Sequence, residues 1–461
     1  MTRVPLSPGA AQPAFLPVEG AFVERGEPGP WDIGSAEQQP DWPDPVQAAA
    51  VGAELARLPG LVTWEEVRLL RTLLAGAAAG HYQVIQAGDC AEDPAECAPS
   101  AVRRKAGLLD ALAGVMEAGT GKPVVRIGRI AGQFAKPRSA TTESVAGLTL
   151  PVYRGHLVNA PEPTPSARQA DPQRMLDCYH AAARALTCLR QRTSAGTPST
   201  AAPVWTSHEA LVFAYELPLL RRTPTGQTLL ASTHLPWIGE RTRQPDGPHA
   251  MMLAHVANPV ACKVGPTTRP DELLALCSRL DPGREPGRLT LIARMGARTA
   301  AAALPPLVSA VHRAGHPVVW LCDPMHGNTV KSPTGAKIRS VRSLRTEVRT
   351  FLTAVTEAGG TPAGLHLEST PYDVTECVWD DSTELDSAEI DCTELGSAER
   401  DFAAHEPATP HTPTNALAHT PAPASHCDPR LNPAQAVEVA RAWATARATR
   451  PPTRMAGSAL H

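Results

Sequence analysis

The stretch at residues 318–329, VVWLCDPMHGNT, predicts the fold of this chain. It starts as a short apolar run rich in β-forming residues and ends in the polar side chains of Asp323, His326 and Asn328. Such a run is typical of a buried parallel strand that delivers polar groups to one end of a sheet. The same change from apolar to polar recurs in seven other segments: 84–92, 124–133, 204–210, 235–243, 259–266, 289–297 and 364–371.

Helical patterns separate these eight strand-like segments, as expected for repeated β–α units. Eight such units predict an α/β fold, the (β/α)8 barrel, whose active sites collect at the C-terminal ends of the strands. The chain of 461 residues is long enough for a barrel of about 250 residues with additions. The clearest helical patterns cover residues 44–58, 64–79, 98–117, 171–193 and 433–448.

The sequence divides into four parts around the predicted barrel. We expect a helical N-terminal extension at 1–80, the barrel at 81–378, an acidic and Pro-rich insertion at 379–426, and a closing segment with the last helix and tail at 427–461. The first 60 residues should pack outside the barrel or against another subunit. The insertion carries an imperfect ten-residue repeat and cannot bury a core, so we expect it to be mobile and solvated. A long irregular segment is predicted at 145–170.

Charge and composition exclude several classes of protein. The formal net charge of −3 argues against a nucleic-acid partner or a polybasic membrane contact. No apolar run approaches the roughly 20 residues that cross a membrane, and the first residues lack the apolar core of a signal peptide. The 10 cysteines form no CxxC pair, which indicates reduced thiols in a cytoplasmic protein. Nucleotide-binding loops are not indicated, and Ser207-His208 lacks the nucleophile elbow of a hydrolase.

Four side chains of metal-binding type lie at or near the ends of strand-like segments or before the last helix. They are Cys90, His326, Glu368 and Asp428. In a barrel these ends converge, and a thiolate, an imidazole and two carboxylates suit a divalent transition metal such as Mn, Co, Fe or Zn. The alternative is that His326, one of 16 histidines, is a structural or surface group.

Cations also gather at the predicted strand ends. Such a group would repel itself unless an anion is bound, and phosphate suits planar guanidinium groups. The alternative is that two or three of these arginines pair with Glu240, Asp246 or Glu209. The number of cations still favours a site for phosphorylated, acidic ligands. The cations are Arg129, Lys136, Arg138, Arg241, Arg243, Lys263 and Arg294.

These motifs together resemble a known family. The chain is similar to the class II (plant-type) 3-deoxy-D-arabino-heptulosonate 7-phosphate synthases, or DAHP synthases, over roughly residues 30–450. The fold that this resemblance implies is the same (β/α)8 barrel, with N-terminal helical additions. The motifs that carry it are QAGDCAE (86–92), RIAGQFAKPRS (129–139), WTSHEAL (205–211), WIGERTRQ (237–244), NPVACKVGP (258–266), ARMG (293–296), CDPMHGNT (322–329), HLEST (366–370), VTEC (374–377) and CDPRLN (427–432).

The resemblance implies a role for each matched residue. The metal ligands would be Cys90, His326, Glu368 and Asp428, with Mn²⁺ or Co²⁺ as the metal and Zn²⁺ or Fe²⁺ as alternatives. Phosphoenolpyruvate would be held by Arg129, Glu240, Arg241, Lys263 and Arg294, and the erythrose 4-phosphate end by Lys136, Arg138 and Ser139.

The reaction implied is the first step of the shikimate pathway. The metal would polarise the aldehyde of erythrose 4-phosphate, C3 of phosphoenolpyruvate would attack it, water would add at C2, and phosphate would leave. Glu240 and Lys263 would orient that water and move protons as the catalytic pair. The resemblance also implies a homo-oligomer and a chorismate mutase partner. Because Cys427 adjoins Asp428, we expect it to lie near Cys90.

The sequence departs from the family pattern at several positions. Val378-Trp379 replaces a glycine pair, Ala261 replaces a glycine, and the long insertion stands just before Asp428. None of these changes alters a predicted ligand. Two alternatives to a DAHP synthase nevertheless stay open. One is an amino-analogue synthase of a secondary-metabolite pathway, and the other is a non-catalytic regulatory subunit.

Overall fold

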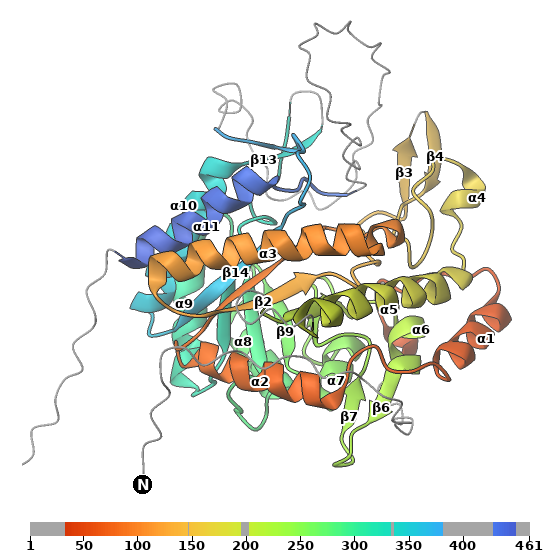
Figure 1. Ribbon diagram of the computed structural model, residues 1–461, viewed down its shortest axis with the longest axis horizontal. Coiled ribbons are helices and arrows are strands. Elements are labelled where there is room, and N and C mark those ends of the chain that lie inside the picture. Colours follow the sequence, from red (N-terminus) through yellow and green to blue (C-terminus); the bar gives the residue numbers. More distant parts are fainter. Residues whose placement is uncertain (1–32, 146, 195–201, 333–335, 381–426, 449–461) are drawn as a thin grey trace, which may run out of the picture.

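Eight parallel strands close into a barrel at the centre of the computed structural model (Figure 1). The structure describes residues 33–145, 147–194, 202–332, 336–380 and 427–448. Around the barrel the strands follow the order β1-β14-β11-β10-β9-β8-β5-β2, and every neighbouring pair is parallel. The eight predicted strands and the (β/α)8 fold are therefore confirmed. The strands are β1 (Gln83–Gly88), β2 (Val124–Arg129), β5 (Val204–Glu209), β8 (Leu235–Ile238), β9 (Val260–Val264), β10 (Leu289–Ala293), β11 (Val319–Cys322) and β14 (Pro362–Glu368).

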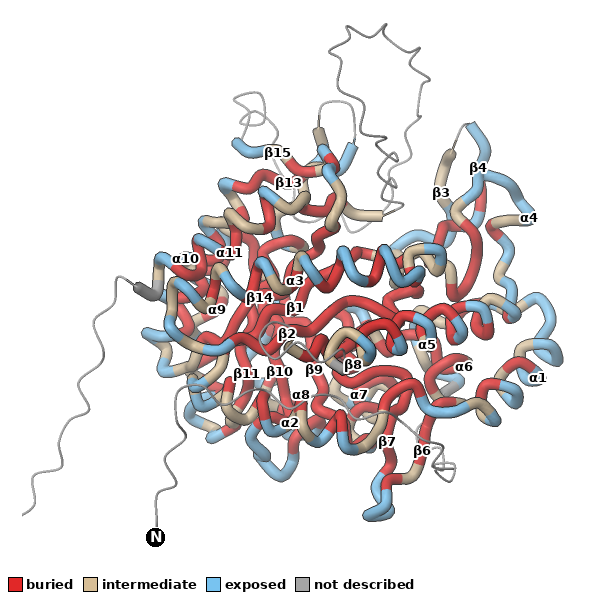
Figure 2. Tube along the Cα trace, in the orientation of Figure 1, coloured by how far each residue is buried: buried red, intermediate tan, exposed pale blue. Residues whose placement is uncertain are grey.

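Helices surround this barrel, and the strands and inward helix faces are buried while the outer faces are exposed (Figure 2). The helix α11 packs against both α3 and α10 and so closes the ring beside β1 and β14. No helix among the described residues is long and apolar enough to cross a membrane. The principal helices are α1 (Pro45–Leu55), α2 (Trp64–Ala78), α3 (Pro99–Thr120), α5 (Gln173–Ser194), α7 (Pro248–His255), α8 (Pro270–Leu280), α9 (Ala300–Arg313), α10 (Val341–Glu357) and α11 (Pro433–Ala448).

The helix α2 closes the N-terminal end of the barrel. It begins with a capping box, in which Thr63 accepts from the backbone of Glu66 and the Glu66 carboxylate accepts from the backbone of Thr63. Its buried face then packs on the apolar residues inside the barrel, among them the fully buried Trp205 and Trp237. Trp237 also borders the polar end of the barrel, because the Arg129 guanidinium lies 5.2 Å from its ring centroid.

The segment predicted as irregular contains regular structure. Within 145–170, the strand β4 (Leu148–Pro151) pairs antiparallel with β3 (Thr142–Val145), which ends where the segment begins, and a short helix, α4 (Pro165–Arg168), follows (Figure 1). This prediction was therefore wrong in part, because four-residue strands with mixed burial carry no periodic signal. The remaining short elements are α6 (Phe213–Glu216), β6 (Leu220–Arg222), β7 (Thr228–Leu230), β12 (Val330–Lys331), β13 (Lys337–Ser340) and β15 (Cys377–Val378).

Pieces of two predicted parts fall outside the described residues. These are the first 32 residues of the N-terminal extension and most of the insertion, from residue 381 to residue 426. The expectation that the insertion is mobile and solvated therefore stays a prediction.

Candidate active site

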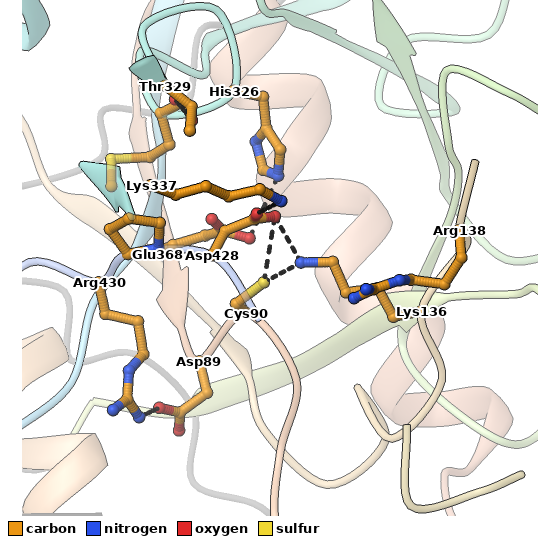
Figure 3. A network of polar contacts seen from close by, with 12 residues as sticks. Asp89, Cys90, Lys136, Arg138, His326, Thr329, Lys337, Glu368, Asp428 and Arg430 are labelled. Carbon is orange, nitrogen blue, oxygen red and sulfur yellow. Dashed lines mark hydrogen bonds and ion pairs between the residues drawn. The ribbon is translucent and has the colours of Figure 1, made fainter. Parts of the chain in front are cut away.

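The four side chains predicted as metal ligands meet at the C-terminal end of the barrel (Figure 3). Cys90 lies just beyond β1, Glu368 ends β14, His326 follows β11, and Asp428 precedes α11. Ligand atoms of Cys90, Glu368 and Asp428 lie within 4.8 Å of one another and could hold a metal ion. His326 joins them, because its Nε2 is 3.2 Å from Glu368 Oε1. The fold thus brings together residues as far as 338 positions apart in the chain.

The Asp323 carboxylate sets the orientation of His326. Asp323 is fully buried, and its Oδ2 is 2.7 Å from His326 Nδ1. Because an ionised carboxylate only accepts, Nδ1 carries a proton that it donates to Asp323, and Nε2 is turned toward Glu368. Burial would raise the pKa of Asp323, but the charges of His326 and Lys263 outweigh it and hold that pKa well below its ordinary value. Asp323 therefore stays ionised and fixes a proton on His326 Nδ1, so that Nε2 is the nitrogen that a bound metal would take.

A buried ion-pair network holds Cys90 next to Asp428. Arg430 Nη1 is 2.9 Å from Asp89 Oδ1, and Lys105 Nζ is 2.7 Å from Asp89 Oδ2. Asp89 directly precedes Cys90, and Arg430 follows Asp428 by two residues (Figure 3). The Asp89–Arg430 pair therefore joins the two chain segments that carry these ligands.

Two lysines contact the ligand group directly. Lys136 Nζ lies 2.5 Å from Asp428 Oδ2 and also contacts Cys90 Sγ (Figure 3). Lys337 Nζ lies 2.9 Å from Asp428 Oδ1. Burial would raise the pKa of Asp428, but the lysine charges help to hold it far below its ordinary value. Lys136 was predicted at the erythrose 4-phosphate end of the site, and its ammonium reaches the proposed metal ligands.

Glu368 has cations on both carboxylate oxygens. Arg339 Nη1 lies 2.7 Å from Oε2, and Arg129 Nη2 lies 3.2 Å from Oε1. Burial would raise the pKa of Glu368, but His326, Arg339 and Arg129 outweigh it and hold that pKa well below its ordinary value. Glu368 is therefore an ionised, buried carboxylate.

The residues present fit a divalent cation. Burial, a hydrogen bond with Cys427 and the charge of Glu368 raise the pKa of the Cys90 thiol well above its ordinary value. A thiol that coordinates a cation loses its proton, so a bound metal would lower the raised pKa of Cys90. The Lys136 ammonium between Cys90 Sγ and Asp428 Oδ2 marks a point where positive charge is already stabilised. Cys427 lies beside Cys90, as expected from its place in the sequence.

Three of the predicted phosphoenolpyruvate cations border this ligand group. Lys263 Nζ, on β9, is 3.1 Å from Asp323 Oδ2 and 3.3 Å from His326 Nδ1. Arg294 follows β10 and donates from Nη2 to the His326 carbonyl at 3.2 Å. Burial lowers the pKa of Lys263, with Asp323 opposing and Arg129 adding to the shift. Lys263, Arg294 and Arg129 thus surround the same region from three strands.

Other predicted substrate residues lie toward the outer edge of the site. Arg241 is exposed, and its Nη2 donates to Ser139 Oγ at 2.7 Å. This bond ties the segment after β8 to the segment after β2. Arg138 Nη2 is 3.0 Å from Glu143 Oε2, so it pairs with the β3–β4 hairpin.

The Glu240 carboxylate forms ion pairs with two neighbouring arginines. Its Oε1 is 2.9 Å from Arg243 Nη2, and its Oε2 is 3.9 Å from Arg294 Nη1. Arg243 also pairs with Glu272 at 2.5 Å. Arg243 therefore belongs to the arginines that pair with carboxylates, the alternative weighed from the sequence.

Glu347, on α10, clamps two of the loops that carry site residues. Its Oε1 accepts from the backbone nitrogens of Met295 and Gly296 at 2.9 and 2.8 Å. Its Oε2 accepts from Asn328 Nδ2 at 2.5 Å. One carboxyl group thus holds the loop after Arg294 against the loop that contains His326.

The pH dependence of stability should reveal Glu347. Burial raises its pKa from 4.5 to about 8, despite the three N–H donors. Between these values the unfolded chain loses a proton that the folded protein keeps, so the free energy of unfolding should fall as pH rises. Glu347→Gln lacks this slope. Thermal melts at about pH 5.5 and about pH 8 should show the wild type losing melting temperature relative to the variant. An equal difference at both pH values would contradict this prediction.

Sequence reasoning missed several residues of the site. Arg339 and Lys337 lie on the short strand β13, Glu347 lies on a surrounding helix, and Asp323 was noted only as a polar strand end. The three cations at 331, 337 and 339, in the segment after the CDPMHGNT motif, were the one signal available. A separate cavity of about 540 Å³, lined in part by Arg71 and Arg288, lies at the opposite end of the barrel.

Comparisons with known proteins find relatives that align over most of the chain. The model of the class-II DAHP synthetase family matches residues 27–203 and 197–393 of the chain. A probable phospho-2-dehydro-3-deoxyheptonate aldolase from Pseudomonas fluorescens is 49% identical over 409 residues, which cover 88% of this chain and 94% of that protein. A phospho-2-dehydro-3-deoxyheptonate aldolase from Streptomyces coelicolor is 38% identical over 394 residues, 76% of this chain and 88% of that protein. A DAHP synthase structure from Thermotoga maritima aligns with a TM-score of 0.34 and 16% identity over 65% of each chain, too distant to inform the fold.

Proposed function

Because the chain belongs to the class-II DAHP synthetase family, we propose that it condenses phosphoenolpyruvate with erythrose 4-phosphate to give DAHP and phosphate. In this proposal the reaction is the first step of the shikimate pathway. The observation that carries the proposal is the meeting of Cys90, His326, Glu368 and Asp428 beside buried cations at one end of the barrel. Two anionic substrates need such cations, which offset their mutual repulsion and fix their orientation.

We propose that Cys90, His326, Glu368 and Asp428 hold a divalent metal, with Mn²⁺ or Co²⁺ ahead of Zn²⁺ or Fe²⁺. When bound, the metal supplies a Lewis acid for the aldehyde oxygen of erythrose 4-phosphate. The chain's own residues prepare the ligands. Asp323 turns His326 Nε2 toward Glu368, and the Asp89–Arg430 pair brings Cys90 next to Asp428.

The cations around the ligand group would hold the substrates. Arg129, Lys263 and Arg294, with Glu240 and Arg241, would bind phosphoenolpyruvate. Lys136, Arg138 and Ser139 would bind the erythrose 4-phosphate end, and the Arg241–Ser139 hydrogen bond supports this arrangement because it joins the two groups of residues.

Glu240 and Lys263 are the proposed proton carriers. The C3 carbon of phosphoenolpyruvate bonds to the aldehyde carbon, whose oxygen must gain a proton. Water then adds at C2 and must lose one, before phosphate leaves. Lys263 is suited to move a proton because burial lowers the pKa of its ammonium. Its contact with His326 places it beside the proposed metal ligand.

Mass analysis of the product tests this function. The protein is incubated with phosphoenolpyruvate, Mn²⁺ and either erythrose 4-phosphate or its imine, and the product is identified by mass spectrometry. We expect DAHP and one equivalent of phosphate for each phosphoenolpyruvate consumed. A product only from the imine of the sugar phosphate would indicate an amino-analogue synthase, and no product from either would indicate a non-catalytic protein.

Substitution of Asp323 should weaken metal binding without removing a ligand. Asp323→Asn keeps the shape but loses the charge that fixes the proton on His326 Nδ1, so we expect metal affinity to fall about 10–100-fold. Competition with a chromophoric chelator measures the affinity. Asp246→Asn is the control, because Asp246 is exposed and pairs only with Arg279 among the described ion pairs. Equal affinity in Asp323→Asn and the control would contradict the role of Asp323.

We also propose a homo-oligomer, a cytoplasmic location and a chorismate mutase partner, with the four-part domain division given above. The family membership supports these proposals. Light scattering of the purified protein tests the oligomer, and co-elution with chorismate mutase tests the partner.

A further inference from the structure

Arg129 has almost no hydrogen-bonding capacity left for a substrate. Its Nε donates to the Asp89 carbonyl at 2.8 Å, and its Nη2 donates to the Cys90 carbonyl at 3.0 Å and to Glu368 Oε1 at 3.2 Å. Its Nη1 is 2.7 Å from His366 Nε2. A guanidinium has five N–H groups, so only one, on Nη1, is uncommitted among the described residues. The direction of that N–H depends on how the guanidinium plane is held.

A chain of hydrogen bonds runs from Arg129 through three buried side chains back to its own strand. His366 Nδ1 is 2.8 Å from Gln86 Oε1, and Gln86 Nε2 donates to Ser207 Oγ at 3.0 Å. Ser207 Oγ donates to the Gly128 carbonyl at 3.0 Å. Gln86, Ser207 and His366 are all fully buried. The chain crosses the four neighbouring strands β14, β1, β2 and β5, and Gln86 and His366 are direct partners in the β1–β14 register.

The two ends of this chain decide the direction of every bond in it. The Gly128 carbonyl can only accept, so Ser207 donates to it and Gln86 donates its amide to Ser207. The Gln86 carbonyl then faces His366, which must donate from Nδ1. At the other end Arg129 can only donate, so His366 Nε2 must accept. The opposite amide orientation of Gln86 would place an N–H of His366 against an N–H of Arg129.

We propose that Gln86 and His366 are positioning residues that hold the Arg129 guanidinium so that its last N–H points at the phosphoenolpyruvate anion. This inference rests on the proposed function, because it takes phosphoenolpyruvate as the ligand of Arg129. His366 acts as a neutral acceptor, and Gln86 acts through it without touching the substrate. Trp237 supports the same orientation, since the Arg129 guanidinium lies 5.2 Å from its ring centroid.

Calorimetric titration with phosphoenolpyruvate tests the proposal, with Mn²⁺ present at saturation. Gln86→Met keeps the shape of the side chain but removes the acceptor for His366 Nδ1, and we expect the affinity for phosphoenolpyruvate to fall about 10–100-fold. Gln83→Met is the matched control. Gln83 is a second fully buried glutamine of β1, and it accepts from Trp443 Nε1. It should lose stability as Gln86→Met does and keep the wild-type affinity.

A second pair of variants tests the positioning role if Gln86→Met fails to fold. His366→Gln and His366→Met both lose the ring, and only the glutamine brings an amide oxygen that can accept from Arg129 in place of Nε2. The Gln variant should retain most of the affinity, and the Met variant should lose about 10–100-fold. In turnover assays the KM for phosphoenolpyruvate should rise while the KM for erythrose 4-phosphate stays unchanged.

The outcomes separate this inference from the proposed function. Equal affinities in Gln86→Met and Gln83→Met, or in the two His366 variants, would overturn the positioning role even if the wild type makes DAHP. A wild type that binds no phosphoenolpyruvate would overturn it too. A wild type that binds phosphoenolpyruvate and makes no DAHP would contradict the proposed reaction alone, and a weaker Gln86→Met would then still support the positioning role.

Discussion

His326→Ala is expected to lose turnover by about a thousandfold or more, because Lewis-acid stabilisation of the aldehyde is worth several kcal/mol. The imidazole Nε2 faces Glu368 and is held there by Asp323. Bound metal should fall in parallel. The measurements are kcat and the metal content after dialysis. His312→Ala is the control, since His312 is exposed near the end of α9. A variant that keeps both its metal and its turnover would remove His326 from the proposed ligand set.

The largest loss of stability is expected from Lys105→Met. Lys105 is buried, and its Nζ lies 2.7 Å from Asp89, 2.8 Å from Glu96 and 3.6 Å from Glu92. Burial would lower the pKa of Lys105, but these carboxylates outweigh it and raise that pKa well above its ordinary value. Removing the ammonium leaves buried carboxylates uncompensated, which should lower the free energy of unfolding by about 3–5 kcal/mol.

Denaturant unfolding measures the effect of Lys105→Met, with Lys331→Met as the control on an exposed lysine of β12. The control should stay within about 0.5 kcal/mol of the wild type. Metal affinity should also fall in Lys105→Met, because Asp89 joins Arg430 and so holds Cys90 beside Asp428. A variant as stable as the control would show that Arg430 alone compensates the buried charge of Asp89.

The barrel strands were predictable because burial on both faces strongly limits which amino acids they can contain. A strand such as 319–322 must be apolar along its whole length, and the next residues, Asp323 and His326, must be polar because they reach the open end. The same constraint does not act on the β3–β4 hairpin, whose residues are largely exposed or half-buried. The hairpin was therefore predicted as irregular.

The candidate site was predictable in its residue types, while its pairings were not. Cys90, His326, Glu368 and Asp428 follow from strand ends and from the family resemblance. Which cation contacts which ligand depends on distances across the barrel, and no spacing in the sequence encodes them. Arg129 illustrates the limit. Its motif identifies a substrate cation, but only the structure shows that four of its N–H groups are bound to protein atoms.

Restoration of activity by metal after chelation is the most direct test of the proposed metal-dependent synthase. The protein is stripped with a chelator, and loss of phosphoenolpyruvate absorbance is followed as Mn²⁺ or Co²⁺ is returned in the presence of erythrose 4-phosphate. We expect no turnover in the stripped protein and full recovery at one metal ion per chain, with no recovery in His326→Ala. Turnover that survives chelation would contradict the assignment of Cys90, His326, Glu368 and Asp428 as a catalytic metal centre.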